Sequence, residues 1–260
     1  MDAYLFVLAL LPSIVLGWFI YKKDKFGKES KSLLIQLLVG GICSAFLTEV
    51  LSSVYDLIFP NLSLTKFSFI NEKELVVAVF IGIGFIEEFS KWIFLKNFTW
   101  KNKEFDHIYD AIVYAVFVSL GFATLENILY IKGSPSLDLA LKRAILSVPG
   151  HVFNAIIMGT FYGQAKKNLI EKNRFKMNIN LLLSIIMPAI AHGFFDFLLL
   201  IGTKKILIIF YSFVAILYII SFITINKVSK IKYNFKDLIC PNCGNVDSND
   251  ICSVCGNRLK

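Results

Sequence analysis

Apolar residues gather in seven long segments, which are separated by short polar connections. The segments occupy about residues 3–20, 33–59, 75–98, 108–131, 144–163, 180–201 and 205–225. A helix of about 20 apolar residues is long enough to cross the hydrocarbon core of a bilayer. The pattern therefore predicts an all-α fold, a polytopic bundle of about seven transmembrane helices, in which the second helix tilts or breaks near Ser52 and Ser53.

The composition supports a membrane protein. The chain is 56% hydrophobic and its mean hydropathy is +0.66, more than a soluble domain needs. The net charge of +8 comes from 24 Lys and only three Arg, and most of these residues lie in the short connections. The positive-inside rule produces this distribution, so we expect a lipid bilayer as partner and no nucleic acid. Because no basic residues precede the first apolar run, we expect a retained helix and not a cleaved signal peptide.

The basic residues are unequally distributed between alternate connections. One set holds 17 Lys and Arg residues and the other holds seven. The richer set comprises residues 21–32, 96–107, 164–179 and the tail segment 226–239. Since the richer side faces the cytoplasm, we expect the N-terminus outside and the C-terminus inside. The composition is rich in Lys, Ile, Asn and Phe, which is typical of an AT-rich prokaryotic genome. We therefore expect the protein in the cell membrane of a prokaryote.

Seven ionisable residues interrupt the apolar segments at lipid depth. They are Glu87, Glu88, Lys91, Glu126, His151, His192 and Asp196. One charge at the bilayer centre costs about 2.5–3.5 kcal/mol on insertion scales, so such residues are expected to face one another and to be functional. The predicted topology places all seven between the midplane and the outer face, where they can form one site.

The spacings within two helices indicate hydrolytic chemistry. Glu88 and Glu87 precede Lys91 by three and four residues, so they share a helix face with it. Two close carboxylates cannot both ionise cheaply, which suits one of them to act as a general base. His192 and Asp196 are also four residues apart. The aspartate can fix the tautomer of the histidine, and the histidine can donate to a developing oxyanion.

Other interpretations of the same residues remain open at this stage. A proton-coupled transporter also uses Glu, His and Asp near the midplane, although no half-repeat indicates alternating access. A zinc site could use His151, His192, Glu126 and Asp196, although their spacing is not HExxH. The polar residues could also make only helix–helix hydrogen bonds. His151, which follows Pro149 and Gly150, could then cap a broken helix.

Four ordered motifs resemble those of a known family. Residues 87–91 read EEFSK and fit EExxK, and residues 122–127 read FATLEN and fit FxxxEN. An isolated His151 follows, and residues 192–196 read HGFFD and fit HxxxD. Each motif alone is weak, but the ordered set over residues 75–200 resembles the PrsW family of intramembrane proteases. That family is similar to the group of the type II CAAX prenyl endopeptidases and bacteriocin-processing enzymes.

The resemblance implies an enzyme that hydrolyses a peptide bond in a membrane-anchored protein. PrsW-like proteins are linked to regulated intramembrane proteolysis, as the site-1 proteases of a single-pass anti-sigma factor. The resemblance to the CAAX-type enzymes implies that Glu87 activates water and that His192, with Asp196, stabilises the oxyanion. Glu126 or Glu88 would orient the water or protonate the leaving amine, and His151 would assist.

This chain departs from the CAAX-type pattern in two places. Glu126 stands where those enzymes have a histidine, and Lys91 is one residue closer to the glutamate pair than their basic residue. Both departures follow the PrsW pattern. The classification of the family as metallopeptidases leaves a catalytic metal open.

The C-terminal tail carries a second motif. Residues 240–244 read CPNCG and residues 252–256 read CSVCG. Paired CxxC turns followed by glycine predict a Cys₄ zinc ribbon with ligands Cys240, Cys243, Cys252 and Cys255. A disulfide-linked tail is the alternative, but the expected cytoplasmic location is reducing. The sequence thus predicts a transmembrane protease domain at 1–225, a basic linker at 226–239 that lies on the inner membrane surface, and a zinc ribbon at 240–260 that binds an unknown cytosolic partner.

Overall fold

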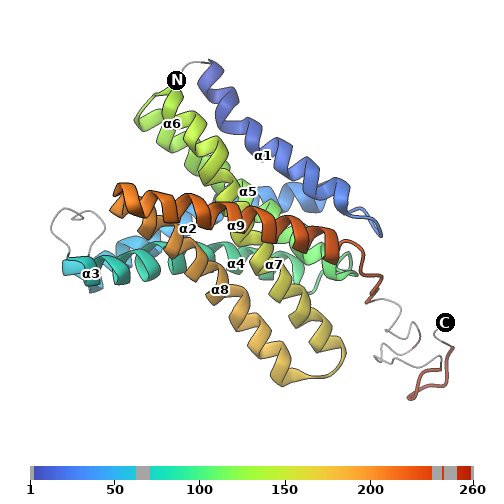
Figure 1. The fold of residues 1–260 in the computed structure, drawn as a ribbon. Helices are drawn as coiled ribbons and strands as arrows, with labels where there is room; N and C mark the ends of the chain where they lie inside the picture. Colours follow the sequence, from blue (N-terminus) through green and yellow to red (C-terminus); the bar gives the residue numbers. More distant parts are fainter. Residues whose placement is uncertain (1–2, 63–70, 236–241, 243–250, 259–260) are drawn as a thin grey trace.

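The computed structural model describes residues 3–62, 71–235, 242 and 251–258, and it is all-α (Figure 1). Its α-helices are α1 (Ala3–Lys23), α2 (Lys31–Ile58), α3 (Glu72–Val77), α4 (Ile86–Thr99), α5 (Ile108–Gly133), α6 (Leu137–Lys142), α7 (Val148–Ile170), α8 (Arg174–Ile201) and α9 (Lys204–Val228). Two π-helical stretches, η3 (Ala78–Phe85) and η4 (Arg143–Ser147), join α3 to α4 and α6 to α7. A 3-10 turn, η1 (Pro60–Leu62), follows α2.

All seven predicted segments are helical. Among the described residues, six helical stretches are long and apolar enough to cross a membrane, which confirms the predicted polytopic helix bundle. The remaining segment, predicted at 75–98, runs as α3, η3 and α4 and carries Glu87, Glu88 and Lys91. α2 passes through Ser52 and Ser53 without a break.

The fifth segment is longer than predicted. Residues 132–143 were expected to form a polar connection because of Lys132, Lys142 and Arg143, but most of them are helical. Ser136 caps the N-terminus of α6 by accepting a hydrogen bond from Leu139 N, and Asp138 pairs with Lys142 one turn later. These local contacts favour a helix despite the charges. α6, η4 and α7 therefore form one stretch from residue 137 to 170, and Pro149 sits in the first turn of α7 without breaking it.

α5 lies at the centre of the bundle. It packs against α1, α2, α4 and α7, and α8 packs against α7 and η3 (Figure 1). α1 and α9 lie at the periphery and expose many large apolar side chains, including Leu11, Trp18 and Ile219. Soluble proteins rarely expose apolar surface on this scale, so these faces contact lipid.

Glycines allow the close helix crossings that surround the polar cluster. A Cβ atom on Gly121 would lie 2.0 Å from Leu38 O, so α5 and α2 touch at their backbones. A Cβ atom on Gly193 would lie 2.9 Å from the Cα atom of Phe80, so α8 also packs closely against the backbone of η3. Gly121 and Gly193 thus permit close approach of the backbones, and these crossings position the helices that carry Glu126 and His192.

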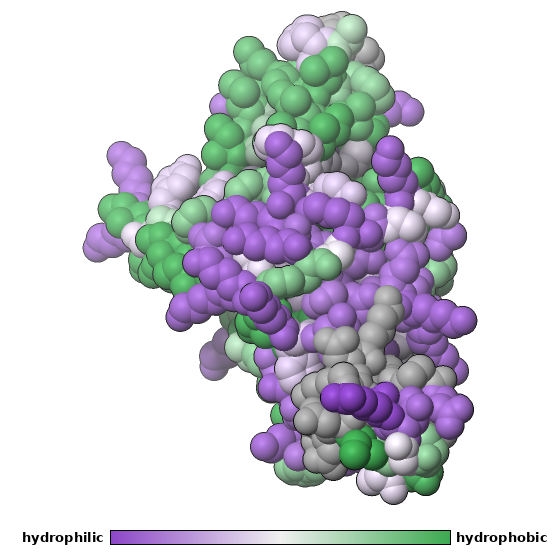
Figure 2. Space-filling view, turned by 90° about the vertical axis from the view of Figure 1, so that its right-hand side faces the viewer, coloured by the Kyte–Doolittle hydropathy of each residue, from purple (hydrophilic) through white to green (hydrophobic). Residues whose placement is uncertain are grey.

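One end of the molecule is strongly polar. Figure 2 views the side on which α9 ends and shows hydrophilic residues gathered over the middle of this face, with hydrophobic residues above them. Exposed lysines near the ends of α1, α4 and α9 include Lys22, Lys101 and Lys230. The bundle thus has a basic end.

Candidate active site

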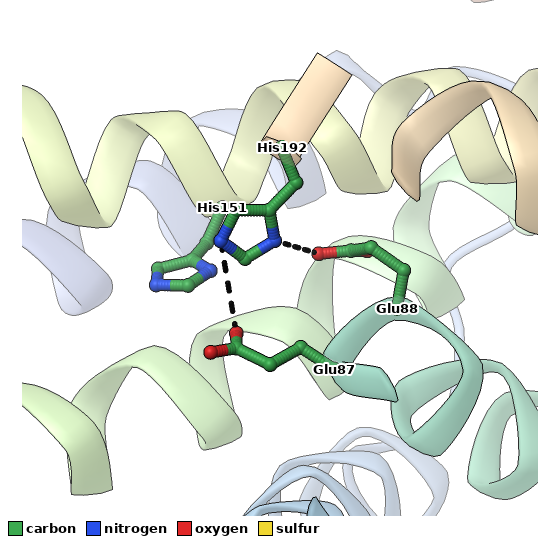
Figure 3. A group of neighbouring side chains, drawn as sticks. All are labelled: Glu87, Glu88, His151 and His192. Carbon is green, nitrogen blue, oxygen red and sulfur yellow. Dashed lines mark hydrogen bonds and ion pairs between the residues drawn. The ribbon is translucent and has the colours of Figure 1, made fainter. Parts of the chain in front are cut away.

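The seven sequence-predicted residues form one connected cluster in the interior of the bundle. α4 contributes Glu87, Glu88 and Lys91, and the other helices contribute one or two residues each: α5 Glu126, α7 His151, and α8 His192 and Asp196. Figure 3 shows the imidazole of His192 between the two glutamates, with His151 beside it. Ion pairs or hydrogen bonds of 3.4 Å or less connect all seven.

Lys91 and Glu88 form the buried centre of this cluster. Each is 1% exposed, and Lys91 Nζ lies 2.8 Å from Glu88 Oε1. The same ammonium lies 3.1 Å from His151 Nδ1 and 3.4 Å from Glu87 Oε2, and it stacks over the ring of Phe122. A buried charge pair survives only where further hydrogen bonds satisfy both ions. Glu88 and Lys91 meet this condition, so they are suited to hold the other members in place.

His192 is fixed on both sides of its ring. Nδ1 lies 2.9 Å from Glu88 Oε1, and Nε2 lies 3.8 Å from Glu87 Oε2 (Figure 3). Nε2 also lies 3.4 Å from Asp196 Oδ2. The spacing of four residues predicted Asp196 as the orienting carboxylate. The shorter contact comes from Glu88, on another helix, so two carboxylates share in orienting this imidazole.

The two glutamates of the EE pair have different surroundings. Glu87 lines a cavity of about 520 Å³ between α2 and α5, whereas Glu88 does not. The other lining residues are Ala45, Phe46, Thr48, Glu49, Phe122, Leu125, Glu126, Leu129, Tyr130, Gly133 and Ser134. Neighbouring residues on a helix point about 100° apart, which sends Glu87 toward the cavity while Glu88 stays in the interior. Glu87 is therefore the carboxylate of the pair that a substrate or a water can reach.

Glu126 and His151 form the second half of the cluster. His151 Nε2 lies 2.8 Å from Glu126 Oε2, and the same oxygen accepts a hydrogen bond from Arg143 Nη2 at 2.9 Å. Ser119 donates to the main-chain oxygen of His151, which ties α7 to α5 at this point. The alternative in which His151 caps a broken helix does not hold, because α7 continues through it.

Three polar residues near the site were not among the predicted candidates. Arg143 also donates through Nε to Asn127 Oδ1 at 2.8 Å, so it clamps the Glu-Asn pair of the FxxxEN motif. It was placed in a connection, and only the helical extension brings it to Glu126. Asn127 belonged to a quoted motif without a role. Glu49 lines the cavity from α2 and belongs to none of the four motifs.

The donor set is compatible with a metal ion. Glu87, Glu88, His151 and His192 each offer a ligand atom, and these atoms lie within 4.8 Å of one another. Imidazole and carboxylate are the ligands of catalytic zinc sites. Lys91 Nζ contacts three of the four residues, so a metal ion would compete with this ammonium.

Comparison with known proteins shows to which family this chain belongs. The model of the PrsW family intramembrane metalloproteases matches residues 29–225, which include every residue of the cluster. The chain belongs to the PrsW family. It is therefore an intramembrane protease and a multi-pass membrane protein, and the resemblance drawn from the four motifs is confirmed.

Curated PrsW relatives are similar along most of their length. Protease PrsW of Halalkalibacterium halodurans is 33% identical over 85% of this chain and 93% of its own. Protease PrsW of Clostridioides difficile is 34% identical over 86% of this chain and 90% of its own. Protease PrsW of Bacillus subtilis is 36% identical over 73% of this chain and 80% of its own. All three relatives are bacterial, and no solved structure gives a significant match.

Proposed function

We propose that this PrsW-family protease uses Glu87 as the general base that activates water for attack on a peptide bond. The supporting observation is that Glu87 alone of the EE pair lines the cavity while its carboxylate stays within 4 Å of Lys91 and His192. A general base must be reachable from the substrate and held in a fixed position. Glu87 meets both conditions.

The neighbouring groups take complementary roles in this proposal. In this proposal His192 is doubly protonated, as the carboxylates of Glu87, Glu88 and Asp196 around its ring favour. Its Nδ1–H donates to Glu88 Oε1, and its Nε2–H donates to the oxyanion that develops on the scissile carbonyl. Glu126, which also lines the cavity, orients the water or returns a proton to the leaving amine. Lys91, His151 and Arg143 hold these carboxylates in position.

A catalytic metal is compatible with the same residues. Glu87, Glu88, His151 and His192 would hold it, and a bound Zn²⁺ would supply an acidified water. The roles of Glu126 and Arg143 as positioning groups are the same with or without the ion.

We further propose that the substrate is a single-pass membrane protein cut near the extracytoplasmic side, such as an anti-sigma factor-like regulator. The cavity walls are mainly apolar, as the side chains of a transmembrane segment require. Placing the lysine-rich connections in the cytoplasm puts Glu126 near the outer end of α5 and the N-terminus outside. This location fits the first cut of regulated intramembrane proteolysis.

The position of the cut tests this proposal. Purified full-length protein in liposomes is mixed with a panel of single-pass proteins, and mass spectrometry identifies the product termini. We expect a cut in the extracytoplasmic half of the substrate segment or just outside it. A cut in the cytoplasmic half would contradict the orientation. A panel in which the anti-sigma factors stay intact while another single-pass protein is cut would contradict the proposed substrate.

For the tail, we propose the Cys₄ zinc ribbon at 240–260, beyond the membrane domain and the basic linker. Cys240 and Cys243 lie outside the described residues. At the second CxxC, Gly256 has φ of +72° and donates its N–H to the main-chain oxygen of Cys252 at 2.9 Å. Glycine adopts this left-handed conformation without strain, and zinc knuckles require such a tight turn. The ribbon is proposed as a docking or regulatory module for a cytosolic partner.

Zinc content tests the ribbon. Full-length protein purified under reducing conditions should lose about one equivalent of zinc in the double variant Cys240→Ser/Cys243→Ser, since a structural site needs all four thiolates. Cys43→Ser, a cysteine in α2, is the matched control and should keep its zinc. Equal zinc in the wild type and the double variant would refute the assignment.

A further inference from the structure

A second polar cluster lies where the connection between α1 and α2 meets the start of α5. Asp24 and Glu29 come from the connection, and Asp110 comes from the first turn of α5. Their exposed fractions are 3%, 5% and 0%. One carboxylate oxygen of each lies within 4.8 Å of the other two. The cluster shares no residue with the active site, and neither the proposed protease chemistry nor the zinc ribbon uses it.

The protein holds two of these carboxylates by one oxygen and leaves the other oxygen unpaired. Asp110 Oδ2 accepts the main-chain N–H groups of Asp106 and His107, at 2.9 and 2.6 Å. Asp24 Oδ1 accepts the N–H of Phe26 at 3.3 Å. Among the described residues, Asp110 Oδ1 and Asp24 Oδ2 are buried and have no hydrogen-bond partner. A buried acceptor without a partner is unfavourable, so these two oxygens are suited to bind a ligand.

The third carboxylate is fixed in a similar way. Glu29 Oε2 accepts a hydrogen bond from the fully buried hydroxyl of Tyr114 at 2.7 Å. Burial raises the pKa of Glu29 to about 8 and also raises the pKa of Asp24, because a charge here is poorly solvated. Three carboxyl groups thus lie close together in the interior, fixed in position but with their negative charge poorly compensated.

The cationic side chains nearby are engaged elsewhere. Among the described residues, no Lys or Arg forms an ion pair with Asp24, Glu29 or Asp110. Lys28 Nζ instead donates to the main-chain oxygen of Asp24 at 2.6 Å. The His107 imidazole pairs with Asp106 and lies 4.0 Å from Asp110 Oδ2.

We propose that Asp24, Glu29 and Asp110 bind a hard divalent cation of the Mg²⁺ or Ca²⁺ class. Carboxylate oxygens are the ligands these ions prefer, and a set with no sulfur does not select a soft metal. The cation would neutralise the buried carboxylates and clip the connection between α1 and α2 to the start of α5. The clip would extend to the segment after α9, because Phe235 N donates to the main-chain oxygen of Asp106 at 2.6 Å.

Terbium luminescence tests this site in the full-length protein, purified in an uncharged detergent. Tb³⁺ occupies oxygen-ligand sites of this kind, and Tyr114, whose hydroxyl donates to Glu29, would sensitise its emission. We expect saturable emission that Ca²⁺ or Mg²⁺ displaces. Asp24→Asn and Glu29→Gln keep the shape of the site and remove a charge. Each should weaken binding by roughly 10- to 100-fold or more, the range found even for outer-shell changes at metal sites. Asp138→Asn, at an exposed ion pair on α6, should bind as the wild type does.

Thermal unfolding separates loss of the cation from loss of the fold. Ca²⁺ or Mg²⁺ should raise the unfolding temperature of the wild type and not that of Glu29→Gln. In chelator, Glu29→Gln should unfold at the same temperature as the wild type or higher, because a poorly compensated buried charge is gone. Emission that is absent in the wild type, or that persists unchanged in both Asp24→Asn and Glu29→Gln, would overturn the proposal. Emission lost only in Glu87→Gln would assign the ion to the active site and would also overturn it.

Discussion

Glu87→Gln is expected to lower the rate of peptide cleavage by at least about 10³-fold, near the upper part of the range for general-base catalysis. The amide has nearly the same shape as the carboxylate, but it cannot accept a proton from water. Its oxygen can still accept from Lys91, 3.4 Å away, so the fold should be kept. The measurement is the single-turnover rate of cleavage in liposomes, together with the yield and unfolding temperature of each protein.

Glu171→Gln is the matched control for this substitution. Glu171 lies at the C-terminus of α7, is exposed, and pairs with Lys167. The same chemical change there should leave cleavage within a factor of about two, because exposed ion pairs contribute little. If Glu87→Gln cleaved as fast as Glu171→Gln, Glu87 would not be the base.

His192→Ala is expected to lower the rate of cleavage by about 10²–10³-fold, as loss of one oxyanion donor does elsewhere. It removes the donor beside Glu87 and also takes away one of the two partners of Glu88 Oε1. Glu88 keeps its contact with Lys91 at 2.8 Å, so the loss should be mainly catalytic. Rate constants at saturating and at low substrate separate a loss of transition-state stabilisation from a loss of substrate binding. Loss of a transition-state donor lowers both rate constants equally.

Asn178→Ala supplies the comparison on the same helix. Asn178 is an exposed residue near the start of α8, and its substitution should leave both rate constants close to the wild-type values. A loss in His192→Ala that appeared only at low substrate would assign this histidine to binding.

The helices and their functional faces were partly readable from the sequence. Seven apolar segments fixed the all-α fold, and the spacings of Glu87, Glu88 and Lys91 predicted contacts within one turn, which the structure contains. The four motifs predicted the family, which the comparisons confirm. These features are local in sequence, so the helical period alone is enough to derive them.

The contacts between helices could not be derived in the same way. Glu88 and His192 lie 104 residues apart, and their contact depends on how α4 and α8 are rotated about their axes. A membrane helix is apolar on all sides and gives no amphipathic signal for that rotation. The π-helical stretch η3 adds to the difficulty, because it changes the phase of the helix just before Glu87. Arg143 was missed because a charged stretch was taken for a connection.

Cleavage of one anchored substrate in H₂¹⁸O is the most direct test of the central claim, that this cluster hydrolyses a peptide bond with Glu87 as the base. Mass spectrometry of the products from wild-type and Glu87→Gln liposomes shows both the chemistry and its dependence on this residue. We expect a new C-terminus carrying ¹⁸O with the wild type and no such product with Glu87→Gln. The same labelled product, formed at the same rate by both proteins, would contradict it.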